Sequence, residues 1–374
     1  MNEPQHSAAL GAPAIHTRAP ALVLRAGHKA AAHIRAHGLK AADVALLPGA
    51  AGGPKGIGLL GLDRAVFGHF LPQAKRTRTL VGASVGCWRF AAVAAGGTDP
   101  QQQVASLERL ARLYSSQRFP KGMRPADVSR QCQAMLDELL DGRDQTLLTN
   151  PDYRLVVIAD RCRHLFASDQ PLVLITALLA LVASNLLSRK SMALFTERTL
   201  LAPGSAPLPL REDGFRSHHL RLDATNLRAA LMASASIPLV LAGVRDMAGA
   251  PAGTYRDGGL LDYHLDLPWQ TDELVLYPHF AERVTPGWFD KPLKWRHADR
   301  ERFSNTLLVA PSADYLAHLP HGKLPSRDDF KRYAGDDVGR ERYWQKAIAE
   351  SDRLGDEFLE LVESKQLADR LIDY

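Results

Sequence analysis

The stretch RTLVGASVGCWRFAAVAAGG, residues 78–97, contains a G-x-S-x-G motif at Gly82–Gly86. The residues before the serine predict a short strand over 78–84, and the alanine-rich residues 85–97 predict a helix that two glycines end. The motif therefore lies at a strand-to-helix junction. We interpret Ser84 as a nucleophile on a sharp turn, because Gly82 and Gly86 leave room for a strained serine backbone and the amides of the helix start stabilise negative charge. A tight turn with a serine cap is the structural alternative.

Strands and helices alternate on both sides of this motif. Residues 43–49 predict a strand that is followed by a helix over 56–71, and further buried strands are predicted over 153–160, 272–279 and 305–312. This alternation, with its short connections, predicts an α/β fold with a mainly parallel sheet. The remaining expectations are helices over 22–38 and 224–238, a strand, glycine turn and strand over 253–268, and connecting segments over 99–127 and 199–216.

The 374 residues are enough for one large domain or two ordinary ones. We expect residues 1–20 to form a flexible N-terminal tail and residues 21–312 to form the α/β domain. Residues 313–374 are expected to be a helical extension packed on that core, because the pattern becomes charged and helical from residue 328 and ends in an amphipathic helix over 356–374.

The composition is that of a globular protein, with 46% hydrophobic and 23% charged residues and a formal net charge of +5. No basic run is interleaved with aromatic residues, so we expect no nucleic-acid partner. The three cysteines, Cys87, Cys132 and Cys162, show neither disulfide-framework nor zinc spacing, and no metal site is expected. The N-terminus shows no apolar segment behind a basic start, so we expect a cytoplasmic location, with peripheral contact to a membrane left open.

The membrane question concerns PLVLITALLALVASNLL, residues 171–187, which is almost entirely apolar. Its apolar part is shorter than the roughly 20 residues that a spanning helix needs. A buried core helix, an interfacial or acyl-contacting helix and a membrane span are the three readings that the sequence leaves open.

The glycine-rich stretch GAAGGPKGIGLLG, residues 49–61, includes a formal G-x-G-x-x-G at its end. A dinucleotide site needs those glycines directly after the first strand and an acidic residue at the end of the second. Here Gly56 comes nine positions after Leu47, and the second strand ends in a serine, so we expect no nucleotide cofactor. The amides of Gly52 and Gly53 are instead candidates for an oxyanion hole beside Ser84.

No histidine stands out as a general base among the 14 in the chain; His218, His219 and His264 are all in contexts typical of ordinary surface or core histidines. The motif YRDGG places Asp257 at a predicted strand end, before a tight turn at Gly258 and Gly259. A D-G-G sequence alone more often marks only a turn.

Four blocks taken together, in this order and spacing, resemble the patatin-like phospholipase family. They are A-G-G-P-K-G at Ala51–Gly56, G-A-S-V-G at Gly82–Gly86, A-S-A-S-I-P at Ala233–Pro238 and D-G-G at Asp257–Gly259. The resemblance implies a three-layer α/β/α core and hydrolysis of lipid acyl esters by a Ser–Asp dyad, without cofactor or metal.

Site roles follow from the resemblance, residue by residue. It implies that Ser84 is the nucleophile, Asp257 the base, and Gly52 and Gly53 the oxyanion donors. The loop is supported by Lys55 and Gly56, the nucleophile turn is formed by Gly82 and Gly86, and the turn after the base is formed by Gly258 and Gly259. The chain departs from the family pattern in having Ala51 where a first glycine is usual, and Pro54 removes one amide donor.

The alternatives are other uses of the same residues. An acyltransferase or thioesterase would use the same dyad with a different acceptor or ester, and a non-catalytic lipid-binding protein could have the same fold. The presence of both Ser84 and Asp257 counts against the binding protein. A nucleotide-binding oxidoreductase is the weakest candidate, for the strand-end reasons given above.

Overall fold

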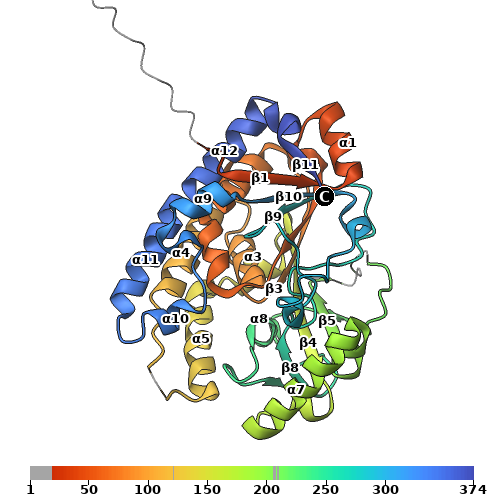
Figure 1. Cartoon of the computed structure of the whole chain (residues 1–374), viewed down its shortest axis with the longest axis vertical. Coiled ribbons are helices and arrows are strands. Elements are labelled where there is room, and N and C mark those ends of the chain that lie inside the picture. The colour runs from red at the N-terminus through yellow and green to blue at the C-terminus, as the bar shows by residue number, and fades with distance from the viewer. Residues whose placement is uncertain (1–18, 121, 205–207, 209) are drawn as a thin grey trace, which may run out of the picture.

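A computed structural model describes residues 19–120, 122–204, 208 and 210–374, so most of the expected N-terminal tail lies outside the described residues. A central sheet runs through the molecule and helices pack against it (Figure 1). The strands are β1 Leu22–Ala26, β2 Val44–Gly49, β3 Arg78–Ala83, β4 Tyr153–Cys162, β5 Thr196–Ala202, β6 Ser217–Arg221, β7 Val244–Arg245, β8 Thr254–Asp257, β9 Leu274–Pro278, β10 Thr306–Pro311 and β11 Leu371–Asp373.

The strand order is β11-β1-β10-β9-β2-β3-β4-β5-β6, with β8 paired to β4 and β7 paired to β8. From β10 to β4 all neighbours are parallel, whereas β1 is antiparallel to β10 and both β5 and β8 are antiparallel to β4. The predicted α/β class with a mainly parallel sheet is therefore confirmed. Because neighbouring parallel strands end at the same edge, the loops after β2 and β3 lie together there.

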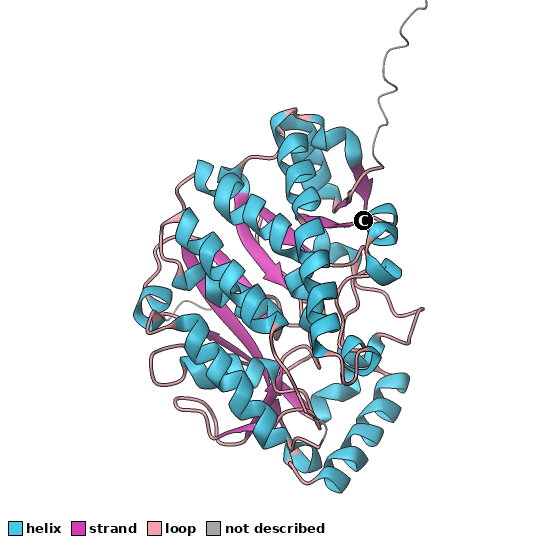
Figure 2. Cartoon of the chain, turned by 90° about the vertical axis from the view of Figure 1, so that its left-hand side faces the viewer, coloured by secondary structure: helices cyan, strands magenta, loops and turns pink. Residues whose placement is uncertain are grey.

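The helices form a thick layer on one side of the sheet, which faces the viewer in Figure 2, and α1 lies on the other side of β1 from α12 (Figure 1). Helices follow residue 313, as predicted. The α-helices are α1 His28–His37, α2 Leu60–Asp63, α3 Val85–Ala95, α4 Pro100–Ser115, α5 Pro125–Leu140, α6 Asp144–Leu148, α7 Pro171–Leu187, α8 Leu227–Ala235, α9 Ala313–His318, α10 Asp329–Arg332, α11 Asp337–Glu350 and α12 Asp352–Glu363.

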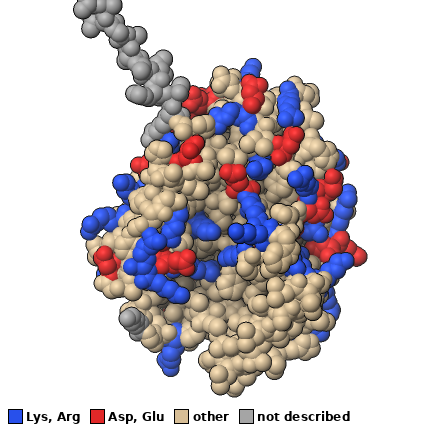
Figure 3. All heavy atoms as spheres, in the orientation of Figure 1, with Lys and Arg blue, Asp and Glu red and all other residues tan. Residues whose placement is uncertain are grey.

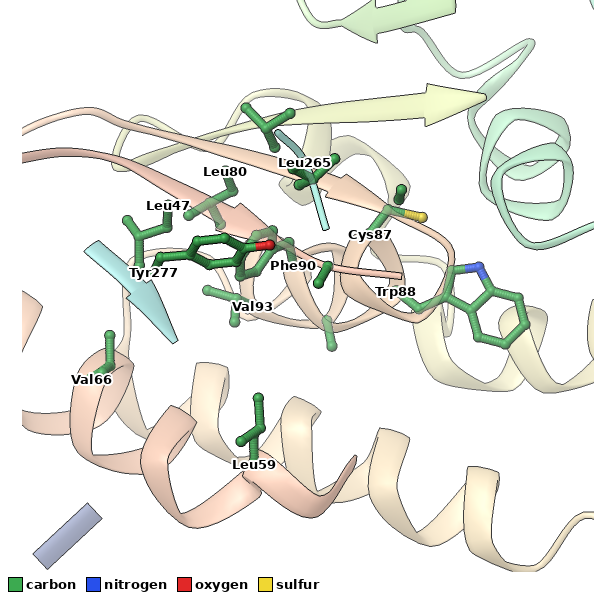
Figure 4. Close-up of a cluster of buried hydrophobic side chains, with 14 of the residues drawn as sticks. Leu47, Leu59, Val66, Leu80, Cys87, Trp88, Phe90, Val93, Leu265 and Tyr277 are labelled. Carbon is green, nitrogen blue, oxygen red and sulfur yellow. The ribbon is translucent and has the colours of Figure 1, made fainter. Parts of the chain in front are cut away.

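The main core lies between the sheet and this helical layer. Figure 4 shows Leu47 of β2 and Leu80 of β3 above Phe90 and Val93 of α3, all of them almost completely buried. Every residue of α3 is buried, because the helix packs under the sheet on one side and against α4 on the other. This is why the helix is not amphipathic. The helix that carries Ser84 at its start is thus held on all sides.

The helix predicted over 22–38 is wrong in its first part. Residues 22–26 form β1, whose side chains alternate between buried and half-buried, and only His28–His37 is helical. The strand forms because β10 offers it an antiparallel partner, and Gly27 separates the two elements where the chain passes directly against Phe303.

Three other segments differ from expectation. The connection expected over 99–127 contains α4, which Asp99 caps by accepting a hydrogen bond from the amide of Gln101, and the start of α5. The connection expected over 199–216 begins with strand residues of β5. Of the strand pair expected over 253–268 only β8 forms, because the chain after Asp257 continues in turns.

The helix expected over 356–374 ends at Glu363. A 3₁₀ turn over Gln366–Arg370 follows, and the last residues form β11, which pairs in parallel with β1. The amphipathic pattern of the segment continues past the end of the helix, but the left-handed backbone of Lys365 (φ 61°) turns the chain toward the open edge of β1.

Candidate active site

Ser84 lies between the end of β3 and the start of α3, as the sequence predicts. Its φ of 55° and ψ of −129° place it in a backbone region that L-residues rarely adopt, at a cost of about 1–3 kcal/mol. A Cβ atom on Gly82 would lie 2.5 Å from the amide nitrogen of Cys87, and one on Gly86 would lie 2.0 Å from the carbonyl oxygen of Gly49. The turn therefore accepts only glycine at both positions.

The backbone of the strained Ser84 is held by a hydrogen bond to Ser234 of α8. The Ser84 amide donates to Ser234 Oγ at 2.9 Å, and the Ser234 hydroxyl donates to the carbonyl of Ile158 on β4 at 2.5 Å. The A-S-A-S-I-P block predicted no role for Ser234, because this role depends on a hydrogen bond to a residue 150 positions away and not on a local sequence pattern.

Asp257 reaches Ser84 through the register of β4. Ala83 pairs with Ile158, and Asp257 pairs with Ala159, the next residue of the same strand. The two strand ends therefore meet, and Ser84 Oγ donates to Asp257 Oδ2 at 2.9 Å. The structure thus brings together the two residues that the sequence predicted as nucleophile and base.

The carboxyl of Asp257 is fixed at its other oxygen as well. Oδ1 accepts from the amide of Gly259 at 2.8 Å. A Cβ on Gly258 would lie 2.4 Å from the Ile158 carbonyl oxygen, and one on Gly259 would lie 2.4 Å from the Cβ of Ala51. Both glycines are needed because the turn passes this close to β4 and to the glycine-rich loop.

Ser84 and Asp257 are 3% and 5% exposed. Burial raises the pKa of Asp257, and the positive charge of Arg327, the Gly259 amide and the Ser84 hydroxyl partly oppose this effect. A carboxylate with a raised pKa is a stronger base than an exposed aspartate, which is the property that removal of the serine proton requires.

The glycine-rich loop lies directly beside this pair. Ala51 donates its amide to the carbonyl of Tyr263 at 2.9 Å, and the start of the loop contacts Gly86 through the Gly49 carbonyl. In the described part of the chain, neither the Gly52 amide nor the Gly53 amide donates to a protein acceptor. Gly53 has a φ of 57°, a left-handed conformation that favours glycine.

Lys55 and Gly56 lie at the far end of this loop. The Nζ of Lys55 is 5.0 Å from the centroid of the Phe280 ring. A Cβ on Gly56 would lie 2.9 Å from a methyl carbon of Val85, the first residue of α3. The loop is consequently packed against the start of the helix that follows Ser84.

A recess of about 10 Å³, room for roughly one water molecule, opens beside Asp257. It is lined by Ala51, Ile237, Asp257, Gly259, Leu260, Tyr263, Trp288 and Arg327. Arg327 also lies against the loop, since a Cβ on Gly53 would be 3.0 Å from its Nε. Sequence reasoning missed Arg327, which follows Asp257 by 70 residues and belongs to no motif.

Two cations lie near Arg327 at the recess. Lys291 Nζ is 4.0 Å from the centroid of the Tyr263 ring, and Lys55 lies over Phe280, whose ring contacts the position of Gly52. Among the described residues, no acidic side chain forms an ion pair with Lys55, Lys291 or Arg327. Burial lowers the pKa of Lys291 to about 7, so the positive charge of the site rests mainly on Arg327 and Lys55.

The histidines take no part in the pair. His264 is buried and its Nδ1 accepts from the Thr285 amide at 3.0 Å, while burial lowers its pKa well below the usual value and keeps the ring neutral. His218 is hydrogen-bonded to Glu197 on the adjacent strand. Of the histidines in the described residues, none is hydrogen-bonded to Ser84.

Comparison with known proteins gives a distant structural likeness. No family model matches the sequence, and no curated protein matches it. The solved structure of human GIVD cytosolic phospholipase A2 is similar with a TM-score of 0.44 and 12% identity over 92% of this chain. The similarity covers 62% of that chain, so the present chain spans less than two thirds of its length.

The sequence left open whether a helix spans a membrane. No helix that the structure describes has both the length and the apolar character that crossing a bilayer requires.

Proposed function

We propose that this protein is a serine esterase of the patatin-like phospholipase type that hydrolyses lipid acyl esters through a Ser84–Asp257 dyad. The observation that carries the proposal is the 2.9 Å hydrogen bond from Ser84 Oγ to Asp257 Oδ2, made by a serine with a φ of 55° at a strand-to-helix turn. This combination is what an activated serine nucleophile needs.

In the first half-reaction Asp257 Oδ2 takes the hydroxyl proton as Ser84 Oγ forms a bond to the ester carbonyl carbon. The carbonyl oxygen becomes an oxyanion, which we assign to the amides of Gly52 and Gly53. When the tetrahedral carbon collapses, its bond to the leaving alcohol breaks, and the alcohol oxygen takes the proton from Asp257. Ser84 is left as an acyl ester.

In the second half-reaction a water molecule gives a proton to Asp257 as its oxygen attacks the acyl carbon. The bond from Ser84 Oγ to that carbon breaks, the fatty acid leaves, and the proton returns to Ser84. The amide of Ser84 is already bonded to Ser234 Oγ, so the oxyanion depends on the glycine-rich loop.

The surroundings of the dyad support a lipid ester with a negatively charged group, such as a phospholipid. Ile237, Leu260 and Trp288 give the recess beside Asp257 an apolar lining, and Arg327 lines the same recess. Partial burial and the neighbouring Arg327 lower the pKa of Lys55, as happens where cations gather. An anionic head group would compensate this charge.

A fluorophosphonate probe tests the nucleophile directly. We expect the purified protein to be labelled at Ser84, as mapped by mass spectrometry, and the labelling to be lost in Ser84→Ala and strongly slowed in Asp257→Asn. The matched control is Asp160→Asn. Asp160 is also a buried carboxyl of this region, but its Oδ2 accepts from the Leu261 amide, and it is not hydrogen-bonded to Ser84.

Labelling of the control at the wild-type rate, together with the loss in Asp257→Asn, would support the dyad. Absence of labelling in folded wild-type protein presented with phospholipid vesicles would overturn the proposal, because an activated serine reacts with this probe irrespective of head-group preference.

A further inference from the structure

Helix α7 presents apolar side chains on two opposite faces. Leu174, Ala177 and Leu181 face inward and are buried. The other face carries Leu172, Ile175, Leu179, Val182 and Leu186, all exposed, with 81% of Leu172 and 66% of Leu179 accessible to solvent. The spacing of three and four residues places these five side chains in one stripe along the helix, which we term the α7 outer face.

Exposed apolar residues also lie in the two turns that flank the helix. Leu165 lies in the 3₁₀ turn before α7, and Leu194 ends the one after it; both turns pack against α7 and both side chains are exposed. Figure 3 shows an almost uncharged surface at the lower right, where Figure 1 places α7. Folded monomers seldom leave so continuous an aliphatic surface in water, so this surface calls for a partner.

The exposed, unpaired charge at the end of the α7 outer face is positive. Between Asp169 and Glu197 the chain has no acidic residue, and its only charged side chains are Arg189 and Lys190 just after the helix. Arg189 is largely buried and pairs with Asp262 and Asp290, so Lys190 is the cation exposed there. The two flanking acids are already paired: Asp169 Oδ1 accepts from Arg256 at 2.6 Å, and Glu197 is buried among Arg161, Arg163, Arg216 and His218. No described acidic side chain forms an ion pair with Lys190, which is exposed.

This pattern fits a lipid surface better than a protein partner. Energetically important positions of protein interfaces are enriched in Trp, Tyr and Arg and depleted in Leu and Val, whereas the α7 outer face is wholly aliphatic. An aliphatic helix face with an exposed cation at its end is an arrangement of helices that lie in the interface of anionic bilayers. We propose that the α7 outer face docks the protein on an anionic phospholipid bilayer, with the helix lying in the membrane plane.

The inference rests on the proposed function, because docking on a bilayer serves catalysis only if the substrate is a lipid ester. The inward residues of α7 belong to a buried cluster that includes Leu260 and against which Trp288 packs. Leu260 and Trp288 also line the recess beside Asp257. A bilayer against the outer face is therefore separated from the wall of the recess by the thickness of one helix, about 10 Å. Docking would bring the dyad to its lipid substrate.

The test measures binding separately from hydrolysis. Vesicles of phosphatidylcholine alone, and of equal parts phosphatidylcholine and phosphatidylglycerol, are floated with the wild-type protein, with Ser84→Ala, and with Leu179→Glu. We expect wild type and Ser84→Ala to float equally and to prefer the anionic vesicles, and Leu179→Glu to bind at least about tenfold more weakly. Lys190→Glu should reduce the preference for anionic vesicles.

The matched control is Val338→Glu, which places the same charge on an exposed aliphatic position of α11. Its vesicle binding should equal that of wild type, and hydrolysis of a water-soluble ester should be unchanged in both Glu variants. Vesicle binding of Leu179→Glu at the wild-type level would overturn the inference. The inference would also be overturned if the wild-type protein did not bind vesicles and instead formed a dimer, detected by light scattering, that Leu179→Glu abolished. Failure of the esterase assay alone leaves the flotation result interpretable.

Discussion

Replacing Asp257 with asparagine removes the proposed base while keeping the shape of the site. The side-chain oxygen of the new amide can still accept from the Gly259 amide, which is 2.8 Å from Asp257 Oδ1. Its NH₂ group takes the place of Oδ2 and donates to Ser84 Oγ, which lies 2.9 Å away. Hydrogen bonds are therefore conserved in number, and the capacity to take the serine proton is lost.

The expected loss of rate follows from that one capacity. A positioned general base contributes about 10²–10⁴-fold to proton transfer, which corresponds to roughly 3–5 kcal/mol of activation free energy. We expect the rate of Ser84 acylation in Asp257→Asn to fall by that factor. In the wild-type protein the same rate should rise with pH as Asp257 loses its proton and then level off, because only the carboxylate can act as the base.

The stability of the same variant should change in the opposite direction. Burial raises the pKa of Asp257, so the folded protein binds this proton more tightly than the unfolded chain does. The favourable contribution of that proton is complete below the unfolded pKa of about 3.9 and is lost as the pH rises through the folded pKa. At neutral pH wild type has a buried carboxylate, whereas Asp257→Asn has a neutral amide. The variant should therefore be the more stable protein at neutral pH, with the difference diminishing toward about pH 4.

Two measurements on the same samples check both expectations. The first is fluorophosphonate labelling under single-turnover conditions across the pH range. The second is urea unfolding at neutral pH and at about pH 4. A labelling rate of Asp257→Asn within a factor of about ten of wild type would refute the assignment of Asp257 as base. A variant that is less stable than wild type at neutral pH would refute the argument that burial disfavours the charged form.

Further predictions concern the support of the nucleophile and the recess. Ser234→Ala leaves the buried Ser84 amide and Ile158 carbonyl without their partner, so we expect a loss of about 2 kcal/mol or more of unfolding free energy in urea melts; a value below about 0.5 kcal/mol would contradict it. Gly86→Ala would place a methyl 2.0 Å from a backbone oxygen. Circular dichroism should show a protein that is unfolded or whose unfolding free energy is lower by at least ~3 kcal/mol, and a wild-type melting curve would be inconsistent with this packing. Arg327→Ala should lower kcat/KM for an anionic phospholipid by about 10–100-fold while sparing an uncharged ester, and an equal loss for both substrates would show that Arg327 does not select charge.

The proposed nucleophile and base could be picked out from the sequence because each has a local signature. G-A-S-V-G at a strand-to-helix junction required a strained turn at Ser84, and the structure shows that turn at a φ of 55°. D-G-G at a strand end indicated a tight turn after Asp257, which is present. The sheet class was likewise readable, because strands β2, β3 and β4 each contain an apolar run, as expected of strands covered on both faces.

The remainder was hidden because it depends on contacts between distant segments. The five residues of β1 fit a helix pattern when read with the residues that follow, and they form a strand because β10, about 280 residues later, offers a partner edge. Arg327 reaches the recess only because the segment between α9 and α10 folds back over the glycine-rich loop. No pattern within either segment indicates these contacts, since pairing edges and converging loops are properties of the assembled fold.

One short segment of β4 positions Ser84, its support Ser234 and Asp257 together. Ile158 pairs with Ala83 just before Ser84, and its carbonyl accepts from the Ser234 hydroxyl that holds the Ser84 amide; the next residue, Ala159, pairs with Asp257. A shift of register by one residue would move a paired strand end by about 3.3 Å and reverse the face on which its side chain lies. The 2.9 Å distance within the dyad therefore depends on a central strand with neighbours on both sides, β3 and β5, rather than on flexible loops. A rigid strand of this kind is suited to hold a reacting pair within the few tenths of an ångström that catalysis requires.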